Sequence, residues 1–286
     1  MRPATAIAIY AVGVVVLSAL VAPWAFILVH PHLPKVPFHR VFDRVLLVVA
    51  LTGLWPLLRS LGLQSWRELG FPRTGTWWRH AAIGYAVGVA SFVVAGALLV
   101  ALGERSFDAN LSADALVMQV LKFAATGIVV AIVEETFFRG GVQSALQRGF
   151  GTITALIVTS AIYSAVHFLK PKGGASDLAI WSSGFEHLWR VISLSARSPG
   201  TAVGFVTLFI AGLILGWAFT KTRALYFPVG VHAGWVVTLK TFALLTGGRP
   251  LIENAAMWPV LVAVLAFVAW WCGGNECNPS LAQARR

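Results

Sequence analysis

Two adjacent glutamates, with an arginine four residues after the second, end the apolar run 123–133: Glu134-Glu135-Thr136-Phe137-Phe138-Arg139. A charged side chain near the centre of a bilayer costs about 2.5–3.5 kcal/mol on insertion scales, so ionisable groups at that depth are candidates for function. On a helix, Glu135 and Arg139 are four residues apart with the acid first, which is the favourable order for an ion pair. Glu134 lies about 100° further round the helix. The stretch therefore predicts that Arg139 holds Glu135 and that Glu134 is left for chemistry.

The composition is that of a polytopic membrane protein. Of the 286 residues, 58% are hydrophobic and only 12% are charged, whereas soluble domains carry about 25% charged residues. We predict an all-α fold that forms a single integral-membrane domain over residues 1–286, with about eight transmembrane helices. The predicted spans are about 5–29, 41–61, 81–102, 115–147, 152–169, 201–219, 225–245 and 255–271. The motif-bearing core is about 115–245.

Two further segments are predicted to lie in the headgroup layer rather than to cross the membrane. The first, about 64–80, mixes three tryptophans with three arginines. The second, about 171–199, carries aromatic and aliphatic residues at near-helical spacing, which is typical of an amphipathic interfacial helix that could border or cover a site. The lipid bilayer is therefore an expected partner of the chain.

The membrane also accounts for the formal net charge of +11. The lysines and arginines lie between apolar runs rather than on one basic face, so they are expected to anchor helix ends and not to bind nucleic acid. Cys272 and Cys277 lie near the C-terminus without neighbouring histidines, which is no zinc signature.

His167 follows the glutamates across a predicted helix reversal. If the chain turns near Phe150, an antiparallel helix pair places His167 and Glu134 at nearly the same depth, on the order of 25 Å from the turn. Tyr163 lies one helical turn before His167 on the same face.

His232 is the third candidate, about one turn after Pro228, which suits the start of a helix. Gly230 and Gly234 flank it and leave room for another backbone or a substrate. The remaining five histidines are expected to be interfacial and solvated: His30, His32, His39, His80 and His187.

Taken in order, these motifs resemble the CPBP family of intramembrane proteases (CAAX protease and bacteriocin-processing, or Abi), which includes the type II CAAX prenyl endopeptidases. The resemblance rests on the Glu134–Arg139 stretch, on Tyr163-Ser164-Ala165-Val166-His167 and on His232-Ala233-Gly234-Trp235-Val236. A glycine-spaced helix containing Gly212 and Gly216 lies between the last two. The resemblance covers about 129–236.

Two positions depart from the family's pattern. Tyr163 stands where the family usually has Phe, and Val236 stands where it usually has Asn. In the family, that Asn is thought to help bind the oxyanion. Tyr163 or Asn254 are candidates to replace it.

The resemblance implies an endopeptidase that hydrolyses a peptide bond near the membrane segment or C-terminal tail of its substrate. Glu134 would activate the water, supported by Glu135 and Arg139. His167 would orient the water or protonate the leaving amine, and His232 would donate to the oxyanion. The expected substrate is a membrane-embedded or lipid-anchored protein or peptide, no cofactor is required, and the Ala-, Gly-, Val- and Arg-rich composition points to a bacterial cytoplasmic membrane.

Two alternatives remain open. In a metal-dependent enzyme, Glu134, Glu135, His167 and His232 would be the ligands of a zinc ion with an open position. In a protein without hydrolytic activity, the same fold would be a membrane scaffold or an immunity-type factor, a reading that Val236 favours.

Overall fold

The computed structural model describes residues 3–107, 112–168, 180–197, 199–246 and 250–273, and every regular element among them is a helix. The predicted all-α class is therefore correct. The helices are α1 (Pro3–Val29), α2 (Phe38–Ser60), α3 (Trp77–Ala101), α4 (Ala113–Glu135), the π-helix η1 (Thr136–Gln143), α5 (Ser144–Phe150), α6 (Thr152–His167), α7 (Ser183–Arg197), α8 (Pro199–Thr222), α9 (Tyr226–Thr246), the 3₁₀-helix η2 (Leu251–Glu253) and α10 (Met257–Gly273).

Six helical segments in the described part of the chain are long and apolar enough to cross a membrane. One of them runs without a break through α4, η1 and α5, from Ala113 to Phe150. Two shorter apolar helices, Thr152–His167 and Met257–Trp271, lie where the fifth and eighth spans are predicted. The chain is an integral membrane protein with several spans.

The chain divides into two compact units, one formed by residues 1–64 and 164–202 and the other by residues 65–163 and 203–286. In the first unit, α1 packs against α2 around a core that includes Phe26 and Phe42. Helix α7 also packs on α1, where Gly184 meets the backbone of Ala19 so closely that a Cβ would overlap the Ala19 carbonyl oxygen.

Helix α7 is amphipathic, as the sequence predicts, although residues 171–179 of the predicted interfacial segment lie outside the described residues. Trp189 is 72% exposed, while His187 is buried against the rings of Phe38 and Phe42. The expectation that His187 is solvated is therefore wrong. Burial, reinforced by the nearby His39 and Arg190, lowers the pKa of His187 to about 4.

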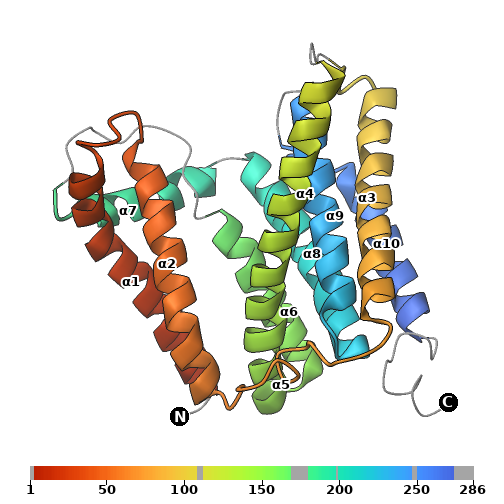
Figure 1. Ribbon diagram of the computed structural model, residues 1–286, viewed down its shortest axis with the longest axis horizontal. Helices are drawn as coiled ribbons and strands as arrows, with labels where there is room; N and C mark the ends of the chain where they lie inside the picture. Colours follow the sequence, from red (N-terminus) through yellow and green to blue (C-terminus); the bar gives the residue numbers. More distant parts are fainter. Residues whose placement is uncertain (1–2, 108–111, 169–179, 198, 247–249, 274–286) are drawn as a thin grey trace. The chain divides into compact units, whose positions relative to one another are not determined.

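In the second unit, α9 packs against both α3 and α4 (Figure 1). Close approach of α3 and α9 depends on Gly84 and Gly88 of α3 and on Gly230 and Gly234 of α9. A Cβ on any of these four glycines would overlap a backbone carbonyl oxygen of the opposite helix. Small residues allow such contacts between membrane helices. The space beside Gly230 and Gly234 is thus taken by the backbone of α3, and His232 between them is held in a fixed position.

Candidate active site

The two glutamates end α4, and the arginine lies in the π-helical turn that follows. The wider turn is closed by Ser144, whose hydroxyl donates to the carbonyl of Arg139 at 3.1 Å. Gly140 faces the loop before α3, and a Cβ there would lie 2.5 Å from the carbonyl oxygen of Leu69. Single π-helical turns inside α-helices occur frequently at functional sites.

Glu135 and Arg139 form a buried ion pair. Arg139 Nη1 donates to Glu135 Oε1 at 3.1 Å, and both side chains are 0% exposed. Arg139 Nη2 donates to the carbonyl of Gly212 on α8 at 3.2 Å. The guanidinium also lies over the ring of Tyr163, 4.6 Å from its centroid, a distance at which cation–π attraction operates. Arg139 is thus fixed by three separate contacts.

His232 joins the two glutamates. Its Nδ1 lies 2.8 Å from Glu135 Oε1, the same oxygen that Arg139 contacts. An ionised carboxylate only accepts, so Nδ1 carries the proton, and in the neutral imidazole Nε2 is an acceptor. Nε2 lies 3.9 Å from Glu134 Oε2. The Glu134 side chain is 26% exposed, against 0% for Glu135.

Tyr163 packs edge-on against the His232 ring, with centroids 6.2 Å apart, and against Phe138 at 5.2 Å. It is 3% exposed. The same ring also faces Arg139, so Tyr163 contacts both of the side chains that bond Glu135. Tyr163 therefore packs against both the imidazole and the guanidinium.

The two candidate substitutes for the family Asn have different surroundings. Asn254 donates to Glu104 at 2.6 Å and accepts from the backbone N–H of Ala256, so its amide is engaged at the start of α10. Val236 itself lies one turn after His232 and faces α4, where a Cβ on Gly127 would be 3.4 Å from the Val236 Cβ. Of the two, only Tyr163 contacts His232.

His167 is the last residue of α6 and belongs to the first unit, whereas Glu134, Glu135, Arg139 and His232 belong to the second. The sequence therefore remains the basis for including His167 in the site.

The family model of the type II CAAX prenyl endopeptidase Rce1-like group matches residues 116–238. This stretch resembles that family, and we call it the Rce1-like region. The match runs from α4 into α9 and includes all five residues that the motifs single out as catalytic. It confirms the resemblance to the CAAX proteases, and the matched family is one of proteases. Searches of curated proteins and of solved structures give no match.

A polar seam, which the sequence reasoning missed, extends from the ion pair inside the Rce1-like region. Gln143 Nε2 donates to the carbonyl of Gly216 at 2.9 Å and to Thr220 Oγ1 at 3.0 Å. Gln147 Nε2 donates to the same hydroxyl at 3.0 Å and accepts from Arg223 at 3.3 Å. The signal in the sequence is a polar residue every fourth position after Glu135, which keeps one face of the helix polar.

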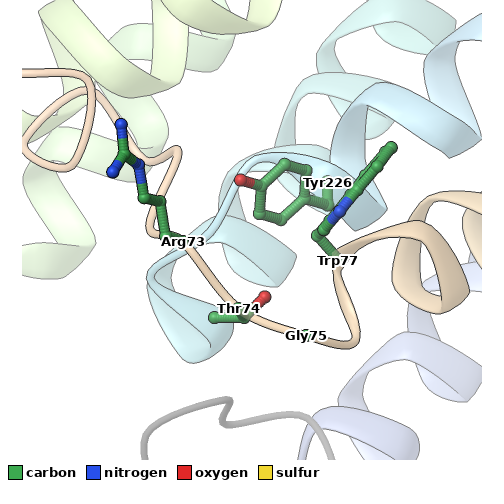
Figure 2. Close-up of a pocket in the computed structure, with 5 residues that line it drawn as sticks. All are labelled: Arg73, Thr74, Gly75, Trp77 and Tyr226. Atoms are coloured by element: carbon green, nitrogen blue, oxygen red, sulfur yellow. The ribbon is translucent and has the colours of Figure 1, made fainter.

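Two of the cavities among the described residues of the second unit are lined neither by the glutamates nor by His232. The larger, about 520 Å³, is lined by Arg73, Thr74, Gly75, Trp77 and Tyr226. Figure 2 shows its two rings side by side, with centroids 5.8 Å apart, and the Arg73 side chain extending away from them. The smaller, about 350 Å³, adjoins the end of the polar seam at Gln147.

The described residues contain no cluster of three or more His, Cys, Asp or Glu side chains placed to hold a metal ion. Within the Rce1-like region, Glu134 Oε2 and His232 Nε2 face one another as two potential ligands. Zinc sites use at least three protein ligands, so a zinc site here would need one more.

Proposed function

We propose that this protein is an intramembrane endopeptidase that cleaves a peptide bond near the membrane segment or C-terminal tail of a protein or peptide. One observation supports this above the rest. A partly exposed carboxylate, Glu134, faces the acceptor nitrogen of a buried histidine, His232, beside a buried ion pair that fixes the histidine.

The gap between Glu134 and His232 suits a water molecule. At 3.9 Å the two atoms are too far apart for a direct hydrogen bond, but a water about 2.8 Å from both can donate one O–H to each. Its lone pairs then remain for attack on a carbonyl carbon. Glu134 takes the proton as the water attacks and returns it to the leaving amine, which is general base and then general acid catalysis.

This arrangement changes the role expected for His232. With Nδ1–H donated to Glu135, a neutral His232 has no proton on Nε2 with which to stabilise an oxyanion. We therefore assign His232 to orienting the water. Glu135 and Arg139 are positioning residues, because the charge on Glu135 fixes the tautomer of His232. His167 is the proposed donor to the oxyanion.

The proposed substrate is a membrane-embedded or lipid-anchored protein or peptide. Its scissile segment has to be locally unwound, because a helix hides its carbonyl groups from attack. We place the enzyme in a bacterial cytoplasmic membrane on the strength of composition alone.

The test compares the C-termini of membrane proteins in cells that carry the wild type, Glu134→Gln or the control Glu104→Gln. Glu104 is exposed and accepts a hydrogen bond from Asn254 at the start of α10. We expect a set of tails that stays uncut only with Glu134→Gln, at equal levels of the three proteins. Cleavage by Glu134→Gln at the wild-type rate would refute the proposed role of Glu134.

The alternatives have distinct outcomes in the same system. Val236 in place of the family Asn favours a scaffold without hydrolytic activity, which predicts identical tails in all three strains. A zinc enzyme predicts that a strong chelator stops cleavage and that zinc restores it. Cleavage that persists in chelator by protein free of zinc would support the water activated by Glu134.

A further inference from the structure

The smaller cavity has a strongly basic lining. Three arginines, Arg67, Arg148 and Arg223, line it with one acid, Glu68, so the formal charge of its lining is +3 − 1 = +2. Three neutral residues with hydrogen-bonding side chains also line it: Ser144, Gln147 and Thr152. We propose that this cavity binds the phosphate-bearing headgroup of an anionic phospholipid.

The surroundings of the cavity place it at the membrane surface. Arg148 lies in the last turn of α5, and the chain reverses at Gly151 before α6. Beside this turn, Phe150 is 52% and Ile153 is 61% exposed, and Trp66, next to Arg67, is 70% exposed. Exposed apolar and aromatic residues next to basic ones are typical of the headgroup layer.

The backbone around the cavity is fixed. Leu225 N–H donates to the carbonyl of Gly70 at 2.7 Å, which joins the loop before α3 to the turn before α9. Gly70 has φ +93°, and a Cβ there would lie 2.8 Å from side-chain atoms of Leu225 and Phe219. The loop that carries Arg67 is thereby held against the end of α8.

Arg223 has an unusual backbone conformation, with φ +52°. Non-glycine residues adopt this left-handed region in only a few per cent of cases. Its guanidinium donates to Gln147, another residue of the lining. Strained residues of this kind cluster at active sites and ligand clamps, and here the bond to Gln147 holds a cation at the cavity wall.

The chemistry of the lining suits a phosphodiester. Guanidinium groups bind two phosphate oxygens at once, and basic pockets between membrane helices bind anionic headgroups. The volume of about 350 Å³ equals roughly twelve water molecules at about 30 Å³ each, enough for a headgroup. A zwitterionic choline headgroup would bring a positive charge against a lining of net positive charge.

The cavity in Figure 2 supplies a matched control. Arg73 belongs to the same loop as Arg67, is exposed, and is the one arginine that lines the larger cavity. Arg73→Gln removes the same charge from the same loop and leaves the lining of the three-arginine cavity unchanged.

The experiment uses the purified full chain in a non-ionic detergent and measures its unfolding midpoint against lipid concentration. The probes are dioctanoyl phosphatidylglycerol, dioctanoyl phosphatidylcholine and inorganic phosphate, tested on the wild type, Arg67→Gln, Arg148→Gln and Arg73→Gln. A ligand that binds only the folded state raises the midpoint as its concentration exceeds Kd. We expect phosphatidylglycerol to raise it, with an apparent Kd at least about tenfold weaker in Arg67→Gln and Arg148→Gln, since each loses a charge-assisted hydrogen bond to the phosphate.

Equal shifts of the midpoint by the two lipids would overturn the proposal. An equal loss of affinity in Arg73→Gln and Arg148→Gln would also overturn it, because the lipid would then be attracted by surface charge in general. If inorganic phosphate alone reproduces the shift and both cavity variants lose it, the anion site stands with free phosphate as its ligand. Arg67 is exposed in a loop, so Arg67→Gln tests the site even if Arg148→Gln fails to fold. None of these outcomes depends on peptidase activity.

Discussion

Removal of either member of the Glu135–Arg139 pair should destabilise the protein at least as much as removal of both. Each side chain is 0% exposed, so Arg139→Met leaves a buried carboxylate and Glu135→Gln leaves a buried guanidinium. Breaking a buried pair by deleting one partner costs about 3–5 kcal/mol. The two single changes therefore sum to about 6–10 kcal/mol.

The double variant leaves no uncompensated charge at this position. Its cost is expected to be no larger than that of one single change, which gives a coupling energy of about 3–5 kcal/mol. Some cost remains, because Arg139→Met also loses the hydrogen bond to Gly212, worth about 1 kcal/mol. The contact with Tyr163 is lost as well.

The assay is equilibrium unfolding by sodium dodecyl sulfate in mixed micelles, followed by the fluorescence of the chain's 12 tryptophans. Glu134→Gln is the matched control: Glu134 is 26% exposed and 3.9 Å from His232, so its loss should cost under about 1 kcal/mol. A coupling below about 0.5 kcal/mol would mean that the pair does not act as a unit. A Glu134→Gln variant as unstable as Glu135→Gln would refute the separation of a structural from a chemical glutamate.

Three further changes test the packing, the titration and the altered motif. In the same unfolding assay, Gly230→Val should lower the free energy of unfolding by several kcal/mol, because the new side chain would overlap a carbonyl of α3. Its control is Gly149→Ala, which has open space around it and should be neutral or slightly stabilising. The pKa of His187 is about 4 in the folded protein and 6.5 ordinarily, so the unfolded chain takes up the proton first as the pH falls. The stability contributed by neutral His187 is present above about pH 6.5 and is lost as the pH falls toward 4. The unfolding midpoint of the wild type should therefore drop across that window, and that of His187→Phe should drop less steeply. Val236→Asn should cost about 1–3 kcal/mol for a half-buried amide, and a peptidase assay should show faster cleavage if the missing donor limits the rate; unchanged or slower cleavage would show that it does not.

The spans could be predicted from the sequence because hydropathy is a local property. The first span, predicted at about 5–29, agrees with the apolar segment Thr5–Val29. The third begins at Trp77 rather than near residue 81, since Trp77, Trp78 and Arg79 belong to the helix instead of lying flat before it. Which amphipathic residues extend a helix depends on what packs against its end, and composition does not contain that information.

Part of the site was predictable because it too depends on local sequence. The Glu135–Arg139 contact follows from helical spacing, but the contact of His232 with Glu135 joins residues 97 positions apart. The environment of His187 was missed because its burial comes from α2, far away in the sequence. Gly230 and Gly234 were correctly expected to leave space, whereas the occupant of that space, α3, depends on tertiary packing.

The structure shows that two glycines of α8 do more than allow close packing. Gly212 and Gly216 allow close helix packing, and their carbonyls also accept from Arg139 and Gln143. A carbonyl oxygen has two lone pairs, so these carbonyls can bond a side chain in addition to the helix. A Cβ on Gly216 would lie 2.7 Å from the Gln143 amide oxygen and displace it. Inside a membrane, where lipid tails offer polar groups no partner, the Gly212 carbonyl helps to explain how a fully buried Arg139 is kept beside Glu135.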